Sequence, residues 1–207
     1  KMLLSLFQNP IVAISFIIAL LIGLTVHEAS HAISANRLGD DTSRLLGRTS
    51  LNPLVHLDPI GTIFLFLVGF GWGKPVPVNP NRFKNPILDE VIVSLSGPTS
   101  NIVLALFFGL ILRIFSQYFS ISLNLLITII VAINLRLAIF NLLPFPPLDG
   151  SKLLQIFMPF NQYIKIQQYG ALILFAIIIF GGSFIYSIVT IPADYLFKLF
   201  VGITPLF

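Results

Sequence analysis

Long apolar runs separated by short polar stretches make up this chain. Residues 11–26 contain no charged side chain, and the helical pattern continues to about Leu38, where Gly39 offers a C-cap. Pro10 suits the first turn of such a helix. A helix needs about 20 apolar residues to cross a bilayer, so this stretch predicts a membrane span. We interpret it as a span and not a signal peptide, because it is too long and has no small-residue cleavage site.

Two further apolar runs predict long helices at residues 87–118 and 121–143, and the second run ends in the proline-rich sequence NLLPFPPLDG. Residues 151–168 have a mixed, amphipathic pattern. The last apolar stretches, 169–188 and 189–202, are interrupted by Gly181-Gly182 and by Pro192-Ala-Asp194. They predict either one long bent span or two short ones.

A shorter apolar segment, residues 61–72, has only twelve residues and lies between basic loops. This is too short for a span, and four prolines follow it in residues 73–86. We therefore expect residues 61–86 to form a re-entrant hairpin and loop that enter and leave on one face. Irregular backbone at membrane depth is tolerated only against protein or a cavity, so the hairpin is expected to cover a polar site.

Composition agrees with this pattern. The 207 residues are 56% hydrophobic and 10% charged, whereas soluble domains are about 25% charged. We predict an all-α polytopic membrane protein with three core spanning helices. It is expected to form one membrane-embedded domain over residues 1–207, with a core at 11–155, the hairpin and loop at 61–86 and one or two C-terminal spans at 169–203. The chain has no cysteine, so any metal must be held by nitrogen and oxygen ligands.

The net charge of +4 does not indicate nucleic-acid binding, because the basic residues lie in short loops, where they orient the chain in the cell membrane. Most fall in loops assigned to one side: Arg37, Arg44, Arg48, Lys74, Arg82, Lys84, Lys152 and Lys165. Arg113 is the main exception. The His27 end of the first helix and Asp149 are therefore predicted to face the cytoplasm.

The candidate chemistry begins with His27-Glu28-Ala29-Ser30-His31 at the end of the first apolar run. Histidines four residues apart lie on one face of a helix, which suits two imidazole bonds to one zinc ion. Glu28, one residue after His27, is rotated away from the helix face that carries the two histidines. It is placed to act as general base and then as acid towards the leaving amine. A catalytic zinc site requires a third protein ligand.

The third ligand is predicted among the eight acidic residues. Six of them lie in predicted loops or loop edges without apolar context: Asp40, Asp41, Asp58, Asp89, Glu90 and Asp194. Glu28 already has a role, which leaves Asp149 beside Gly150. The His27–His31 motif and the remote segment that carries Asp149 are then predicted to lie at the same membrane depth.

Three motifs together resemble the site-2 protease family of intramembrane zinc metalloproteases. They are His27-Glu28-x-x-His31, Gly97-Pro98-x-x-Asn101, and Asn141-x-x-Pro144 running on to Asp149-Gly150. The resemblance covers roughly residues 15–155. It implies one zinc ion per chain, with His27, His31 and Asp149 as ligands and Glu28 as catalytic base.

The resemblance also implies a transmembrane substrate, such as an anti-sigma factor or another membrane-tethered regulator, often trimmed first by a site-1 protease. The chain is similar to the compact, PDZ-less bacterial type, so we expect no periplasmic PDZ domain of the kind that many relatives have. Oligomeric state is left open.

Several other residues have two interpretations. His56 is either a hydrogen-bonded loop histidine or a group near the zinc that contacts substrate, and it is a weaker candidate for a metal ligand than Asp149. Asn101 and Asn141 either hold helices together or donate hydrogen bonds to the substrate carbonyl as it becomes an oxyanion. Arg136 is expected to form a salt bridge or to snorkel to a polar edge.

Backbone features allow similar alternatives. Val76 and Val78, which flank Pro77, are typical of extended backbone and are either part of a rigid loop or an edge that pairs with an unwound substrate strand. Gly97-Pro98 favours a kink or a close helix contact. The glycines in residues 69–73 either permit close packing or act as a hinge.

Two rival functions are compatible with these ligands. A membrane metal-binding protein or transporter would use the same histidines and aspartate but has no need of Glu28 as a base. A catalytically idle scaffold is disfavoured by the intact set of His27, Glu28, His31 and Asp149.

Overall fold

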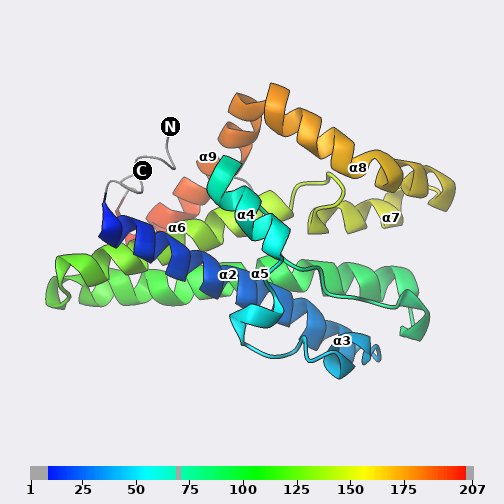
Figure 1. Ribbon diagram of the computed structural model, residues 1–207, viewed down its shortest axis with the longest axis horizontal. Coiled ribbons are helices and arrows are strands. Elements are labelled where there is room, and N and C mark those ends of the chain that lie inside the picture. Colours follow the sequence, from blue (N-terminus) through cyan, green and yellow to red (C-terminus); the bar gives the residue numbers. More distant parts are fainter. Residues whose placement is uncertain (1–8, 69–70, 204–207) are drawn as a thin grey trace.

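The computed structural model describes residues 9–68 and 71–203, without the side chains of 65–68, and contains helices but no strand within those ranges. Three long helices form the centre: α2 (Pro10–Arg37), α5 (Pro86–Phe115) and α6 (Ile121–Asn141). Figure 1 shows them side by side along the longest axis. The three predicted core helices are confirmed, with ends within a few residues of those expected.

Local sequence explains where these helices start and stop. Asn9 caps α2 by accepting a hydrogen bond from the Ile11 backbone at 3.0 Å. Gly39 follows the helix with φ +111°, the left-handed conformation that glycine adopts at low cost. Ser120 caps α6 through the Leu123 backbone N–H at 3.3 Å. α5 continues through Pro98 as a single helix.

Between α2 and α5 the chain makes a hairpin. After α3 (Thr42–Leu45) and the short turn η1 (Pro53–Val55), helix α4 (Pro59–Val68) leads away, and an extended segment returns. We call this segment, residues 71–79, the strap; it ends at η2 (Pro80–Arg82). Leu57 pairs with Gly73 as an isolated antiparallel bridge, so the two ends of the hairpin meet.

After α6 the chain turns through η4 (Asp149–Leu153) and α7 (Leu154–Phe157) into α8 (Phe160–Phe180) and α9 (Gly182–Val201). Two C-terminal helices are therefore present. The expected interruption at Gly181-Gly182 is confirmed, because α8 ends and α9 begins there, whereas the one expected at Pro192-Ala-Asp194 was wrong, because Pro192 lies inside α9. The predicted amphipathic segment 151–168 is divided, because its second half forms the start of α8. Asp194, expected at a loop edge, lies within α9.

Five helices of the described chain are long and apolar enough to cross a membrane. α8 begins near the N-terminal end of α5, because the Gln155 amide donates to Glu90 of α5 at 2.9 Å and to Tyr163 of α8 at 3.1 Å. α9 ends beside the C-terminal end of α5, where Arg113 donates to the Leu199 carbonyl at 3.2 Å. The pair therefore runs from one end of the bundle to the other once (Figure 1). Large apolar side chains such as Phe107 and Leu172 are exposed, as expected for surfaces that face lipid.

Candidate metal centre

The two histidines of α2 and the aspartate that opens η4 come together in the structure. His27 and His31 lie in the C-terminal half of α2 and are buried, and Asp149 is half-buried. Asp149 Oδ2 lies 3.0 Å from His27 Nε2 and 3.4 Å from His31 Nε2. Ligands around a tetrahedral zinc at the usual bond lengths are about 3.3 Å apart. The spacing therefore fits one small divalent cation.

The hydrogen bonds of the two rings define which nitrogens face this centre. His31 Nδ1 lies 2.8 Å from the carbonyl oxygen of Val93, so this nitrogen must carry the proton. His27 Nδ1 lies 2.6 Å from Asn101 Oδ1, an acceptor because the Asn101 amide nitrogen donates elsewhere. Both Nε2 lone pairs consequently face the Asp149 carboxylate.

Asp149 Oδ2 is buried and has no hydrogen-bond donor in the described structure. Two imidazole lone pairs and a carboxylate oxygen thus converge without a proton between them. The three lone pairs repel one another, and a cation bound by all three atoms would remove this repulsion. The residues present therefore fit zinc.

Glycine at position 97 allows α5 to lie against both imidazole rings. A Cβ added to Gly97 would lie 2.5 Å from His31 Nε2 and 2.7 Å from His27 Cε1. The two rings are in edge-to-face contact, with centroids 4.7 Å apart. The expected close helix contact at Gly97-Pro98 is therefore confirmed, and its purpose is to seat α5 on the two histidines.

Glu28 is half-buried on α2, next to the histidine it follows, and makes no hydrogen bond in the described part of the chain. Burial lowers the pKa of the neighbouring Arg48 guanidinium, and the negative charge of Glu28 opposes that shift. A carboxylate with free oxygens beside the metal cluster is able to exchange protons with a bound water or substrate.

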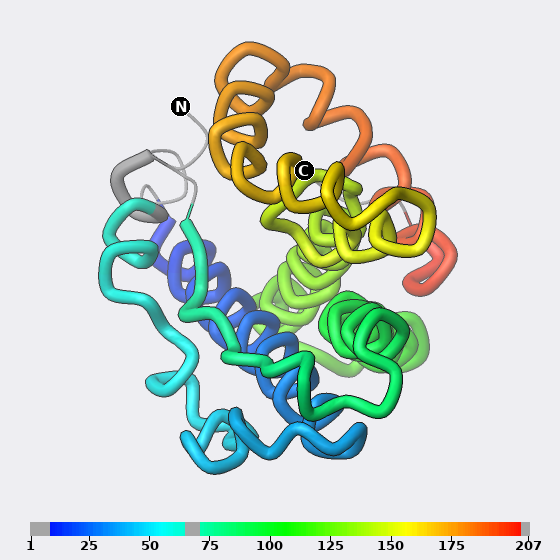
Figure 2. Tube along the Cα trace, turned by 90° about the vertical axis from the view of Figure 1, so that its right-hand side faces the viewer, coloured from blue at the N-terminus to red at the C-terminus, as the bar shows by residue number. Residues whose placement is uncertain are grey.

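The strap follows the C-terminal half of α2. Gly73 contacts Leu24, and Val78 packs on a small core that includes Ala35, so the strap runs along the same stretch of α2 that carries both histidines (Figure 2). The eleven residues of α2 rise about 16 Å, and five extended residues cover about the same distance. By this match in length, Val76 lies near the middle of the stretch of α2 between Leu24 and Ala35.

Both ends of the strap are anchored by polar groups. At its start, the Lys74 N–H donates to the His56 carbonyl at 2.8 Å, and the buried Arg48 donates to the Lys74 carbonyl. At its end, the Asn79 N–H donates to Asp40 Oδ2 at 2.7 Å. Burial alone would raise the pKa of Asp40, but its hydrogen bonds, that from Asn79 first, hold the pKa below the usual value. Asp40 therefore stays ionised at neutral pH.

The backbone N–H groups of Val76 and Val78 have no hydrogen-bond acceptor among the described residues. The middle of the strap is thus an extended edge without a partner strand. Of the expected hinge, residues 69 and 70 lie outside the described residues. Gly73 is confirmed as a position of close packing, because an added Cβ would lie 2.9 Å from Leu24.

Three residues predicted as candidates for substrate contact make hydrogen bonds within the protein. Asn101 is fully buried and donates to the Gly23 carbonyl at 3.0 Å and to Asn134 Oδ1 at 2.8 Å, which leaves no donor for a substrate. His56 is also fully buried, with Nε2 2.7 Å from the Ser50 carbonyl, and it is outside the metal cluster. Asn141 donates to the Leu137 carbonyl at 2.9 Å, and none of its hydrogen bonds reaches the cluster.

Other residues contribute to the centre although the sequence did not single them out. Ser94 donates to the Asp149 carbonyl at 2.9 Å, and Asn134 accepts from Asn101. Ser94 and Asn134 gave no signal beyond being polar residues in apolar helices. The expected salt bridge of Arg136 is confirmed, with Asp194 as partner at 3.4 Å.

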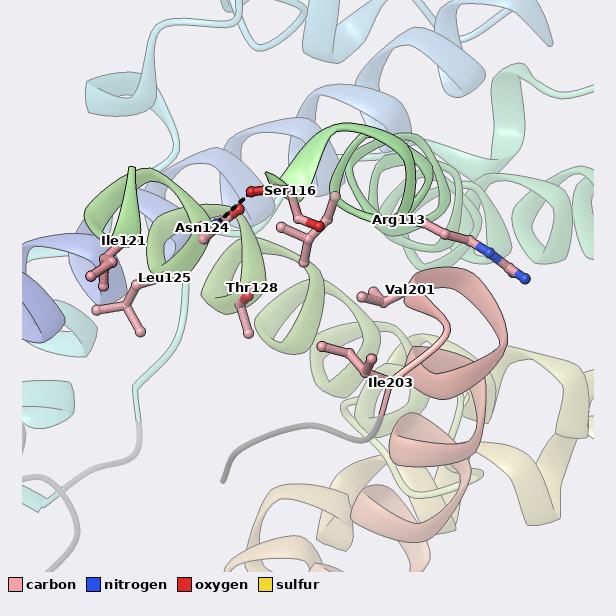
Figure 3. A pocket seen from close by; sticks show the side chains of 9 residues that line it. Arg113, Ser116, Ile121, Asn124, Leu125, Thr128, Val201 and Ile203 are labelled. Carbon is pink, nitrogen blue, oxygen red and sulfur yellow. Dashed lines mark hydrogen bonds between the residues drawn. The ribbon is translucent and has the colours of Figure 1, made fainter. Parts of the chain in front are cut away.

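A separate cavity of about 440 Å³ lies at the opposite end of the bundle, between the ends of α5, α6 and α9 (Figure 3). Its polar lining includes Arg113, Ser116 and Asn124. It contains none of the residues of the metal centre.

The fold and the site together define a membrane-embedded zinc metalloprotease. The model of the family "Peptidase family M50" matches residues 111–181, which include Asp149. The chain is 38% identical over 199 residues to the Bacillus subtilis protein named "Putative zinc metalloprotease YwhC", covering 90% of this chain and 91% of that protein. The chain therefore belongs to peptidase family M50, the site-2 protease family.

More distant relatives carry similar names. "Putative zinc metalloprotease Rip2" of Mycobacterium tuberculosis is 30% identical over 65% of this chain and 54% of its own length. "Zinc metalloprotease MJ0392" of Methanocaldococcus jannaschii is 28% identical over 73% of this chain and 37% of its own length. No solved structure matches the chain.

Proposed function

We propose that this zinc metalloendopeptidase cleaves a peptide bond within or next to a transmembrane segment of a membrane-tethered substrate, in regulated intramembrane proteolysis. The observation that carries the proposal is the convergence of His27 Nε2, His31 Nε2 and Asp149 Oδ2 inside a bundle of apolar helices, with the free carboxylate of Glu28 beside them. Polar groups at such a depth are costly and mark a functional site.

In this proposal His27, His31 and Asp149 hold the zinc ion. When bound, zinc polarises the scissile carbonyl and lowers the pKa of a water molecule to about 7. Glu28 accepts a proton from the attacking water and delivers it to the leaving nitrogen, so that the carbon–nitrogen bond breaks without a net proton change. Asn101 orients His27 through its Nδ1 hydrogen bond and does not contact substrate.

The strap is the proposed docking edge. A helical substrate hides its carbonyl groups in internal hydrogen bonds and must unwind before hydrolysis. Unwound backbone needs new partners, and the unpaired backbone N–H groups of Val76 and Val78 belong to a strap that follows the part of α2 carrying both histidines. Pairing there would hold the substrate extended beside Glu28.

The substrate class follows from the membrane setting. A single-span regulator, for example an anti-sigma factor, presents the required transmembrane segment. Basic residues gather at the end of the bundle nearest the metal centre, which supports a site that faces the cytoplasm. Prior trimming by a site-1 protease remains part of the proposal.

Two variants test the function. Zinc content and cleavage of a reconstituted single-span reporter peptide are measured on the purified chain. We expect Glu28→Gln to keep one zinc per chain and to lower cleavage at least 1,000-fold, roughly the upper part of the range for loss of acid–base catalysis. We expect Asp149→Ala to lose most of the zinc.

The rival function gives different results. A zinc transporter would carry zinc into vesicles and would keep that flux in Glu28→Gln. Flux without cleavage in the parent chain would overturn the proposal. Full zinc retention in Asp149→Ala would remove Asp149 from the ligand set.

A further inference from the structure

Asp149 depends on tertiary contacts for its position more than the two histidines do. His27 and His31 belong to a helix of 28 residues. Asp149 follows a proline-rich turn and opens a five-residue 3-10 helix that has no side-chain cap. Something outside η4 must therefore hold the aspartate at its distance from the imidazoles.

Both oxygens of the Glu90 carboxylate are engaged by the segment that follows Asp149. Lys152 Nζ lies 2.5 Å from Glu90 Oε1, and the Gln155 amide donates to Glu90 Oε2 at 2.9 Å. The pair is largely shielded, with 18% of the Glu90 side chain and 31% of the Lys152 side chain exposed. Burial alone would lower the pKa of Lys152, but the hydrogen bond that Lys152 donates to Glu90 raises the pKa, so Lys152 stays cationic.

A second contact lies one helical turn further along α5. Ser94 donates to the Asp149 carbonyl at 2.9 Å. Residues four apart lie on one face of a helix, so Glu90 and Ser94 grip η4 together, at Lys152 and at Asp149. These two contacts fix both the position and the rotation of a segment only five residues long.

We propose that Glu90 is a positioning residue for the third zinc ligand: its carboxylate clamps Lys152 and Gln155, and so holds Asp149 Oδ2 against His27 and His31. The proposal rests on the proposed function, because it takes Asp149 as a ligand. Glu90 itself contacts neither the metal nor substrate. Partners of this kind change metal affinity by about 10- to 100-fold when they are removed.

The clamp also reaches α8. Gln155 Nε2 contacts the hydroxyl of Tyr163 at 3.1 Å, and Gln167 donates to the same hydroxyl at 2.5 Å. Tyr163 is buried, with 4% of its surface exposed. The start of α8 and the third ligand are therefore held by one hydrogen-bond network.

The test measures zinc affinity of the full chain in detergent, by competition with a chelator, and does not depend on activity. We expect Glu90→Gln and Lys152→Met each to weaken zinc binding about tenfold or more. Lys165→Met is the matched control, because Lys165 is exposed on α8 and has no ion pair in the described structure. It is expected to bind zinc as the parent does.

A charge exchange separates positioning from general stability. Glu90→Lys and Lys152→Glu each place like charges together and are expected to weaken zinc binding, whereas the double exchange restores most of it. The melting temperature of the zinc-free chain is measured in parallel. The clamp is disproved by parent-like affinity in Glu90→Gln and Lys152→Met, by failure of the exchange to rescue, or by losses that the zinc-free melting temperature fully explains.

Zinc binding by Asp149→Ala separates the proposal that Asp149 is a zinc ligand from the proposal that Glu90 positions it. Zinc loss in Asp149→Ala together with parent-like binding in the Glu90 and Lys152 variants would overturn the clamp alone. Unchanged zinc binding in Asp149→Ala would overturn the ligand assignment.

Discussion

At the scale of single residues, one face of α5 organises the whole metal centre. Gly97 seats the helix on both imidazoles, Asn101 fixes His27, and the Val93 carbonyl fixes His31. Ser94 and Glu90 hold the segment that carries Asp149. Most of these positions are three or four residues apart, as residues on one helical face must be. The ligands come from two remote segments, but their orientation comes from one helix.

The cluster of His27, His31 and Asp149 could be predicted from residue types, and Gly97 and Asn101 were singled out by their motif, whereas the other supports could not be predicted. Histidines four residues apart on a helix and an aspartate in an apolar setting have few functions other than metal binding. Val93 contributes only a carbonyl, which any residue has. Glu90 was set aside as a loop-edge acid, because its partner Lys152 lies 62 positions away and only the fold brings them together.

Substitution of Gly97 is expected to disturb both histidines at once. In Gly97→Ala the new methyl group would lie 2.5 Å from His31 Nε2, and either α5 or the ring must move. We expect zinc affinity to fall about tenfold or more, with a parallel loss of cleavage. Gly182→Ala is the control, because no atom lies within 4 Å of a Cβ there. Equal zinc affinity in both variants would contradict the prediction.

At the scale of elements, boundaries were predictable where an apolar run ends at a cap or a proline. The start of α8 at Phe160 was not, because its first turns are polar and include Lys165 and Gln167. Those turns are held by tertiary contacts: Tyr163 joins the Glu90 network, and Gly170 lies against Pro146, where an added Cβ would be 2.3 Å away. Pro192 was expected to interrupt a helix, but proline is tolerated inside membrane helices.

The strap prediction is tested by disulfide trapping in the cysteine-free chain. If the strap adds a strand to the substrate, Val76→Cys should crosslink to a cysteine-scanned substrate at every second position, because strand side chains alternate. Tyr118→Cys, which is 75% exposed at the other end of α5, serves as the control and should give no such pattern. Crosslinks without a period of two, or none, would argue against strand addition.

At the scale of the whole molecule, five helices qualify as spans by length and composition, yet α8 and α9 run in sequence from one end of the bundle to the other. The start of α2 and the end of α9 consequently lie at the same end (Figure 1). Sequence alone left one bent span or two short ones open, because hydropathy gives length and not direction.

This arrangement predicts the sidedness of three exposed positions. Tyr118→Cys and Ile203→Cys are expected to react with a membrane-impermeant maleimide on intact cells, and Leu45→Cys only after permeabilisation, because the basic end of the bundle should face the cytoplasm. Labelling of Ile203→Cys together with Leu45→Cys would mean that α8 and α9 each cross the bilayer. Labelling of Leu45→Cys on intact cells would reverse the orientation.

The strap is matched in length to the stretch of α2 that it follows, and it is pinned at Lys74 and Asn79. Backbone N–H groups would bind any extended peptide, because hydrogen bonds between main chains do not depend on the side chains of the bound segment. If a substrate pairs with the strap as proposed, the scissile bond is chosen by distance and not by sequence: it is the bond that an unwound strand brings to the metal when it extends from the bilayer surface.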